Sequence, residues 1–378
     1  MKAFRVALWF SSQKSKVEID LARNWMALPD AVLRDLFDNL PRPENWDYSN
    51  MYGQRKLREH IAQQYDCDTN NVIITHGAQE ALFLISLIFG KTGVEVVTEQ
   101  PIYHLKEMFE DRNTVVKGVA LSLENAFQPQ LSELEGLLTK QTILVALNHP
   151  HNPSGAMINR EKMLALVRRL EKRGIPLLVD EVYREIGFMD QSHAPPPIAT
   201  IYSKGISVNS LSKAFGVPGL RVGWIVGPTD LIAECGQLRE YTTSGNSVIS
   251  EVMALQILQK RSEILSYVMD RTLQNLDIVG QWLEAHSQYF DFFKPQGGFS
   301  FFPKLKIPVS DEQFCSDLLE NTKVLLLPGS LYDCPGHVRM GLVQPIEEVK
   351  KGLDRIESFL YNRCARVKSE PLTSALGY

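Results

Sequence analysis

The sequence predicts an α/β protein whose larger part is built around a mostly parallel sheet. Between about residue 70 and residue 230, short β-branched runs alternate with longer amphipathic segments, which is the pattern of successive β-α-β units. The expected strands are VIIT (72–75), VEVVTE (94–99), TILVAL (142–147), PLLVDE (176–181), GISVNS (205–210) and VGWIVG (222–227). Helices are expected between them at 79–89, 102–111, 130–138 and 160–173.

The pattern changes after Pro228. Two amphipathic stretches are predicted as helices, and the second is long enough to connect one lobe to another. Their ranges are 229–241 and 247–285, and they are followed by a hairpin or paired strands at 292–305, a helix at 311–320, strands at 324–329 and 337–342, and a last helix at 346–363. This succession indicates a smaller α+β domain.

We therefore predict four parts of the chain. They are an amino-terminal arm that also contributes to the small domain (1–45), a large domain (46–280), a small domain (281–366) and a tail (367–378). The arm shows no strand-helix alternation of its own, so we expect it to pack on another part of the molecule.

Composition excludes several classes of function. A net charge of −4 over 378 residues provides no basic surface of the kind that nucleic acids require. Five scattered cysteines without a C-x-x-C pair predict neither a disulfide framework nor a metal site, and they favour a cytoplasmic location. No segment approaches the roughly 18 to 20 apolar residues of a membrane span, and the first residues lack the pattern of a signal peptide. A soluble protein without a membrane partner is expected.

Lys213 follows directly on the expected strand 205–210, so it lies at the carboxyl end of that strand, where open α/β sheets bind ligands. On its own, a lysine in a small polar loop indicates only exposed surface. Here Ser210, Ser212 and Arg221 flank it, and all three can donate hydrogen bonds to a phosphate. A plain turn between two buried strands would not require these three side chains. The pattern predicts a phosphorylated cofactor beside a nucleophilic amine.

Asp180 ends an apolar run, at a position where a buried strand normally avoids a charge unless the charge has a strong partner or caps a helix. The pyridinium nitrogen of pyridoxal phosphate is such a partner, because a carboxylate keeps it protonated and the ring electron-withdrawing. Tyr183 could donate a hydrogen bond to the phenolic oxygen of that ring. Asn152, in NHPHNPSGA (148–156), could donate to the same oxygen, although Asn-Pro-Ser-Gly turns are common without any ligand.

A possible phosphate site lies upstream, in THGAQEAL (75–82). Gly77, Ala78 and Gln79 stand at the start of a helix that follows a strand, where free N–H groups and the helix dipole favour an anion. Many α/β turns share this arrangement and bind nothing, so the motif gains meaning only from its distance to the others.

Taken together, these motifs resemble the class I/II aminotransferases, which are fold-type I pyridoxal-phosphate enzymes, from about Val17 to Leu360. The resemblance implies a large domain with a mostly parallel seven-stranded sheet, a smaller α+β domain and a Schiff base between Lys213 and pyridoxal 5'-phosphate. It implies that Tyr103 stacks on the cofactor and that Tyr48 reaches the phosphate of a neighbouring subunit, so that a homodimer shares its active sites.

For the substrate, the resemblance implies that Arg339 binds the α-carboxylate of an amino acid. The reaction would run through an external aldimine and a quinonoid, with Lys213 as the base at Cα and Asp180 beneath the ring. Transamination from an L-α-amino acid to a 2-oxo acid is the leading interpretation. Asn152 would contribute to the substrate side of the pocket as well as to the cofactor side.

One stretch departs from the family pattern. Relatives typically carry a small Ser-Gly type turn after the first strand, whereas DLARNWMALP (20–29) places Asn24, Trp25 and Met26 there. Arginine oxidases, capreomycidine synthase and the enduracididine-forming cyclase resemble the chain in motif spacing without transaminating. Glu18, Asp20 and Asn24 are candidates for binding a guanidinium, so a cyclase or oxidase acting on arginine or hydroxyarginine is the alternative. A decarboxylase or β-lyase stays open, and His149, where Asn is common, is interpreted as structural.

Overall fold

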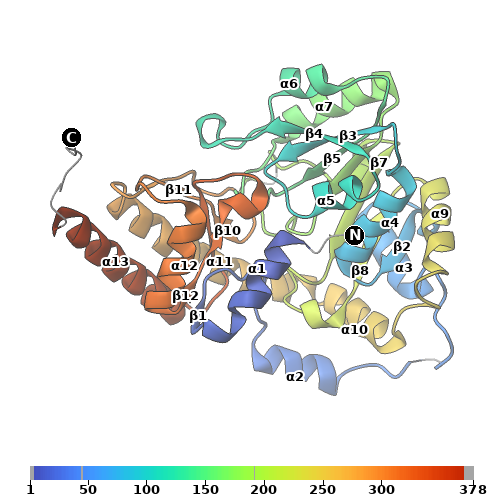
Figure 1. Cartoon of the computed structure of the whole chain (residues 1–378). Helices are drawn as coiled ribbons and strands as arrows, with labels where there is room; N and C mark the ends of the chain where they lie inside the picture. The colour runs from blue at the N-terminus through green and yellow to red at the C-terminus, as the bar shows by residue number, and fades with distance from the viewer. Residues whose placement is uncertain (1–3, 44–45, 191, 370–378) are drawn as a thin grey trace.

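A computed structural model describes residues 4–43, 46–190 and 192–369, and it forms two lobes, the larger of which is built around one central sheet (Figure 1). The sheet has seven strands in the order β2-β8-β7-β6-β5-β3-β4, and β8 alone runs antiparallel to its two neighbours. The strands are β2 (Val72–Thr75), β3 (Glu95–Gln100), β4 (Val115–Ala120), β5 (Thr142–Asn148), β6 (Leu177–Asp180), β7 (Gly205–Ser210) and β8 (Gly223–Val226). The prediction of a mostly parallel seven-stranded sheet is confirmed.

Helices cover both faces of the sheet because the strands are apolar on both sides. In β5, Leu144 and Ala146 face the cluster that contains α4, α5 and α9, whereas Val145 and Leu147 face the cluster that contains α6 and α7. The helices of this lobe are α3 (Arg55–Gln64), α4 (Gly77–Phe89), α5 (Leu105–Glu110), α6 (Leu131–Leu137), α7 (Arg160–Arg173), α8 (Ile198–Ile201), α9 (Thr229–Arg239) and α10 (Val248–Gln259).

Two features of this lobe differ from the sequence prediction. β4 was not predicted, because it is an edge strand whose residues are mostly exposed or half-buried, and it therefore lacks a continuous apolar run. The single helix predicted at 247–285 is wrong. The chain forms α10 and then α11 (Arg261–Ala285), with a break at Lys260, where the backbone leaves the helical conformation.

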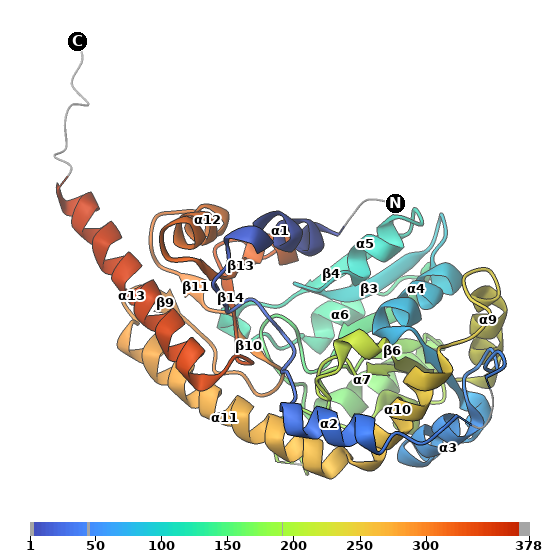
Figure 2. The ribbon, with the colours of Figure 1, turned by 90° about the horizontal axis from the view of Figure 1, so that it is seen from below.

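The second lobe is assembled from both ends of the chain. β1 (Ile19–Asp20) pairs in parallel with β12 (Val324–Leu325), so residues more than 300 positions apart lie side by side. Helix α11 runs from the sheet lobe beneath this second lobe, and α13 packs along it (Figure 2). The remaining elements are α1 (Arg5–Gln13), α2 (Asp30–Asp38), β9 (Phe290–Asp291), β10 (Ser300–Phe301), β11 (Lys304–Leu305), α12 (Asp311–Thr322), β13 (Leu327–Pro328), β14 (Val338–Gly341) and α13 (Ile346–Ser369).

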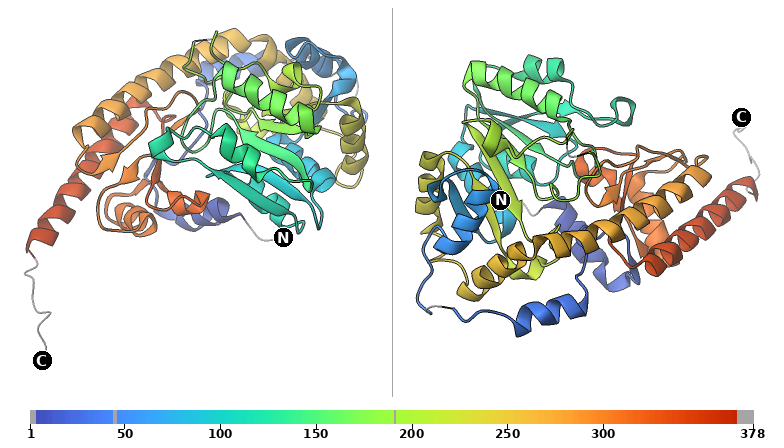
Figure 3. Two further views of the ribbon diagram at one scale, coloured as in Figure 1. Left: turned by 90° about the horizontal axis from the view of Figure 1, so that it is seen from above. Right: turned by 180° about the vertical axis from the view of Figure 1, so that it is seen from behind.

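The strands of the second lobe are short. β14 pairs with both β10 and β13, and β9 pairs with β11 across the ends of the predicted hairpin. The described part of the chain also contains five short 3-10 helices, at Lys14–Lys16, Thr69–Asn71, Leu123–Asn125, Pro218–Leu220 and Gly329–Tyr332. The amino-terminal arm is more regular than predicted, because it forms α1 and α2, and α2 lies beside α10 (Figure 3). The predicted division into four parts stays a prediction, and most of the predicted tail lies outside the described residues.

No helix within the described ranges combines the length and the apolar character needed to cross a membrane.

The core of the second lobe provides a test of this packing. Phe314 of α12 is fully buried, and its ring centre lies 5.8 Å from that of Phe359 on α13. We expect Phe314→Ala to lower the free energy of unfolding by about 3–5 kcal/mol, because a cavity remains where the ring was. Tyr361→Ala, at a residue of α13 that is 55% exposed, should change it by less than about 0.5 kcal/mol. Chemical denaturation of both variants measures the difference, and equal losses would contradict the assignment of Phe314 to this core.

Candidate active site

The candidate site lies where three parallel strands end at the same edge of the sheet. Asn148 ends β5, Asp180 ends β6 and Ser210 ends β7, and the register pairs Asn148 with Asp180 directly. Lys213 follows Ser210 by three residues. The alternation of strands and helices therefore brings together residues that are far apart in the chain, as the sequence predicts for an open α/β sheet.

Lys213 and Tyr183 are connected through Asn24. The Lys213 Nζ lies 2.7 Å from Asn24 Oδ1, and Asn24 Nδ2 donates a hydrogen bond to the Tyr183 hydroxyl over 2.9 Å. The pKa of Lys213 is lowered to about 7, mainly by loss of hydration and then by the Arg339 cation, while Asp180 acts in the opposite direction. An appreciable share of this lysine is therefore a neutral amine near neutral pH.

Asp180 is a carboxylate without a cationic partner in contact. Among the described residues, the one hydrogen bond that its side chain accepts comes from the Val182 N–H, at 3.2 Å. Burial raises the pKa of Asp180 to about 7, and the nearby Lys213 opposes this rise only in part. A cationic or N–H donor group that fills the space beside this carboxylate would restore its usual acidity.

Arg339 comes into the site from β14 of the second lobe and is buried. Its Nη1 donates to Asn152 Oδ1 over 3.2 Å and its Nη2 donates to the Ala22 carbonyl, while its Nε is buried without a partner among the described residues. The guanidinium therefore retains donor capacity, as a carboxylate-binding arginine requires.

A second network, which the sequence analysis did not identify, supports Asn152 from behind. Asn148 accepts a hydrogen bond from the Asn152 N–H (2.7 Å) and donates its own side-chain amide to the Asp180 carbonyl (2.9 Å). Glu99, at the end of β3, accepts the Asn148 N–H over 2.6 Å, and burial raises the pKa of Glu99 to about 8. Asn148 and Glu99 each stand at or near the end of an apolar strand, and this pattern in the sequence could have identified them.

The predicted phosphate-binding residues converge at the start of α4. Arg221 Nη2 donates to the His76 carbonyl over 3.0 Å, and its Nη1 lies 3.4 Å from Ser212 Oγ. Gly77 has a φ of +76°, and a Cβ built on it would clash with the Arg221 guanidinium. A Cβ on Gly223 would lie 2.7 Å from the Ala78 nitrogen, so two glycines permit this close approach.

The other predicted phosphate ligands lie around the same turn. Ser210 is buried, and its Oγ accepts the Ser212 N–H over 3.3 Å. Gln79 is exposed in the first turn of α4, and it lines a cavity of about 410 Å³ together with His76 and Arg221. The first turn of this 13-residue helix therefore lies beside the Arg221 guanidinium.

A cavity of about 1040 Å³ is lined by Arg339 together with most of the other predicted substrate residues. Tyr103, Asn24 and Trp25 line it. The Arg23 guanidinium lies over the Trp25 ring, 4.7 Å from the ring centre. Tyr103 packs against His104, with ring centres 3.6 Å apart.

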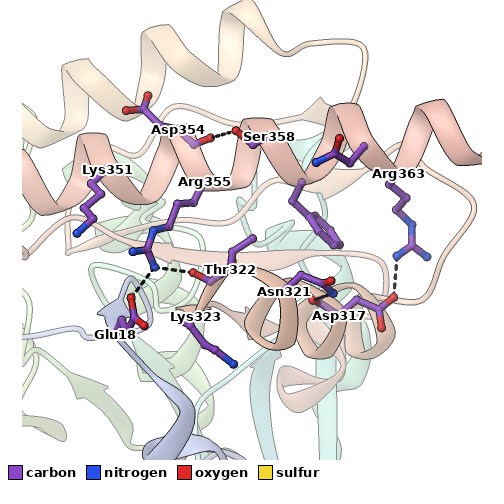
Figure 4. Close-up of a pocket in the computed structure, with 12 residues that line it drawn as sticks. Glu18, Asp317, Asn321, Thr322, Lys323, Lys351, Asp354, Arg355, Ser358 and Arg363 are labelled. Atoms are coloured by element: carbon purple, nitrogen blue, oxygen red, sulfur yellow. Dashed lines mark hydrogen bonds and ion pairs between the residues drawn. The ribbon is translucent and has the colours of Figure 1, made fainter.

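Three residues lie away from this centre or play another part. Glu18 is at the cavity rim, but its carboxylate pairs with Arg355 of α13 over 2.9 Å, in a charged groove between α12 and α13 (Figure 4). Tyr48 is 86% exposed and makes no contact with the cluster. His149 is buried and accepts the Ile158 N–H, and burial lowers its pKa to about 3, so it stays neutral.

The unusual basicity of Lys213 can be measured directly. We expect labelling of its amine across a pH series, on protein freed of bound ligands, to be half-maximal near pH 7. Arg339→Met should raise the midpoint because it removes a neighbouring cation, and Asp180→Asn should lower it because it removes the opposing carboxylate. Peptide mapping by mass reports Lys213 beside exposed lysines, which titrate near about pH 10.4. A Lys213 midpoint equal to theirs would contradict this description.

The chain matches the family model of aminotransferase class I and II over residues 18–356. Aspartate aminotransferase of Thermotoga maritima is 31% identical over 343 residues, with 89% of each chain covered. Capreomycidine synthase of Streptomyces vinaceus is 31% identical over 82% of this chain and 79% of its own. Arginine–pyruvate transaminase of Pseudomonas aeruginosa is 30% identical over 87% and 86%.

A solved structure agrees with these matches. A PLP-dependent aminotransferase from Streptococcus suis superposes with a TM-score of 0.89 at 27% identity, and the alignment covers 96% of this chain and 98% of that one. The fold-type I architecture predicted from the motif spacing is therefore confirmed. The chain belongs to the aminotransferase class I and II family.

Proposed function

We propose that this chain is a pyridoxal-phosphate-dependent aminotransferase that moves an amino group from an L-α-amino acid to a 2-oxo acid. The observation that carries the proposal is the placement of Lys213 and Asp180 at one edge of the sheet. The Lys213 amine is partly neutral near neutral pH, and the Asp180 carboxylate has no cationic partner in contact among the described residues. Membership of the aminotransferase class I and II family supports the same conclusion.

The residues present fit the cofactor. Lys213 would hold it as a Schiff base. Asp180 would accept a hydrogen bond from the protonated ring nitrogen, which would give its carboxylate a cationic partner. Asn152 and Tyr183 would contact the ring oxygen, and Tyr103 would cover the ring face. The phosphate would be held by Gly77, Ala78, Gln79, Ser210, Ser212 and Arg221. When bound, pyridoxal phosphate supplies an electron-withdrawing ring that stabilises negative charge at the substrate Cα.

The chain itself supplies the proton transfers. A lysine with a pKa of about 7 takes up and returns a proton efficiently near neutral pH, so Lys213 is suited to be the general base at Cα. A cation beside Asp180 would lower the pKa of that carboxyl, which then remains ionised and keeps the ring nitrogen protonated. Both roles depend on the exclusion of water by the buried strand ends.

Arg339 orients the substrate in this proposal. Its position on β14 is rigid because it is hydrogen-bonded to Asn152 and to the Ala22 carbonyl, and a substrate carboxylate would receive the donors that remain free. The α-amino group would then point toward Lys213. Asn24 and Trp25 face the rest of the substrate from the cavity wall.

The assembly and location are also proposals. A homodimer that shares its active sites would give the exposed Tyr48 a place at the phosphate of the partner, and Tyr48 already lines a cavity of about 740 Å³ with α3 and α10. Four of the five cysteines are free thiols, which suits the cytoplasm, and Cys364 lies outside the described side chains.

A cyclase or oxidase acting on arginine or hydroxyarginine is the second candidate. The stretch 24–26 is the observation that favours it, together with the similarity to capreomycidine synthase and arginine–pyruvate transaminase. Asp20 is a half-buried carboxylate on the cavity wall, where it lies 3.9 Å from the Arg23 Nε and could face a substrate guanidinium, whereas Glu18 is paired with Arg355 of α13.

The cofactor assignment can be tested on the purified protein. We expect it to be yellow, and borohydride reduction followed by peptide mapping should label Lys213. Gly77→Ala should bind pyridoxal phosphate more weakly by tenfold or more, or about 1.4 kcal/mol, because the new Cβ displaces the Arg221 guanidinium. Gly219→Ala is the matched control, since a Cβ there meets nothing within 4 Å. A label on another lysine would contradict the assignment of Lys213.

The reaction itself is tested with a panel of amino acids, including arginine and hydroxyarginine, each with and without a 2-oxo acid. Product masses that depend on the 2-oxo acid support amino transfer. A product formed from arginine or hydroxyarginine without any acceptor supports the cyclase, and oxygen consumption supports the oxidase. We expect Lys213→Ala to abolish turnover, because both the Schiff base and the base at Cα are removed.

A further inference from the structure

Asn24 occupies an unusual position for a residue of the substrate wall, because its side-chain amide bridges two groups of the catalytic centre. Its Oδ1 accepts the hydrogen bond of the Lys213 Nζ at 2.7 Å, and its Nδ2 donates to the Tyr183 hydroxyl at 2.9 Å. The opposite orientation of the amide would place two donors against each other at the protonated lysine, so the Lys213 contact fixes which end faces the tyrosine.

This orientation decides what the Tyr183 hydroxyl can do. A hydroxyl has one hydrogen to donate, and its oxygen can accept two hydrogen bonds. Because the oxygen accepts from Asn24 and makes no other hydrogen bond within the described residues, the hydrogen stays available for a further acceptor. Burial raises the pKa of Tyr183 well above its usual value, so the hydroxyl keeps that hydrogen.

We propose that Asn24 is a positioning residue that holds the Tyr183 hydroxyl as a donor toward the ring oxygen of the cofactor and thereby sets the basicity of the Lys213 nitrogen. The inference rests on the proposed cofactor. A hydrogen bond to the ring oxygen reduces the negative charge beside the Schiff-base nitrogen, and this favours the unprotonated form of that nitrogen. Asn24 is thus engaged by the chain's own catalytic groups, in addition to facing the cavity.

Other charges act on the same nitrogen and must stay constant in a test. Within the described chain these are Asp180 on β6, Arg339 on β14 and Arg221 after the turn that follows Lys213. The Tyr183 ring itself lies 6.0 Å from the lysine nitrogen. Substitutions at Asn24 leave all four side chains in place, so a shift in the titration reports on the amide.

The resting holoenzyme provides the measurement, because visible absorption distinguishes the protonated and unprotonated Schiff base. We expect Asn24→Asp to raise its pKa by at least about one pH unit, since a carboxylate near the nitrogen stabilises the cation and accepts the Tyr183 hydrogen. Ala27→Asp is the matched control, because it adds the same charge to the same loop at an exposed position, where solvent screens it. Its pKa should remain that of the parent enzyme.

A double-mutant cycle separates an effect through Tyr183 from a direct effect on the lysine. We expect Asn24→Ala to raise the Schiff-base pKa when Tyr183 is present, and not to raise it in the Tyr183→Phe background. The same shift in both backgrounds, or no shift at all, would overturn the proposal. Asn24→Ala also carries the test if the aspartate variant does not fold.

A role of Asn24 in substrate binding alone gives a different result. In that case the variants raise KM for the amino acid, while the titration of the resting enzyme is unchanged, and our proposal is then wrong. The titration needs no substrate, so a lack of amino transfer contradicts the proposed function without affecting this inference. A holoenzyme that carries no Schiff base at Lys213 contradicts the cofactor assignment on which both rest.

Discussion

The feature on which the rest of the site depends is a pair of buried ionisable groups at the end of the sheet that are not paired with each other. Asp180 ends β6 and Lys213 follows β7, both are largely shielded from water, and each has a pKa displaced toward its neutral form. A bound group that brings a cation to one and a covalent bond to the other would relieve both. Binding and stability of the folded chain are therefore coupled in this protein.

A chain of hydrogen bonds connects this edge of the sheet to the second lobe. It runs from Glu99 through Asn148 and Asn152 to Arg339, which also holds the Ala22 carbonyl. Arg339 and Asn152, to which we assign the substrate carboxylate and the cofactor, thus share one framework, although they come from different lobes. Rigid placement of such groups is what positions a substrate for reaction.

The sequence predicted most of the sheet because buried parallel strands leave long apolar runs, and it predicted Lys213 and Asp180 because a charge at the end of such a run requires an explanation. It did not predict β4, because this edge strand is partly exposed and has no continuous apolar run. It did not predict the break at Lys260 either, because no proline or glycine marks that position. The Asn24 bridge could not be predicted either, because Asn24 lies 159 positions before Tyr183 and 189 positions before Lys213 in the chain.

The pairing of β1 with β12 has a wider consequence. The loop 20–29 is fixed at its base by the second lobe, yet Asn24 within it contacts Lys213 of the first lobe. A substitution in this loop can therefore change the surroundings of Lys213 without altering the sheet or the turn that carries Arg221. A short segment near the beginning of the chain thus acts on the site as a part that is separate from the sheet.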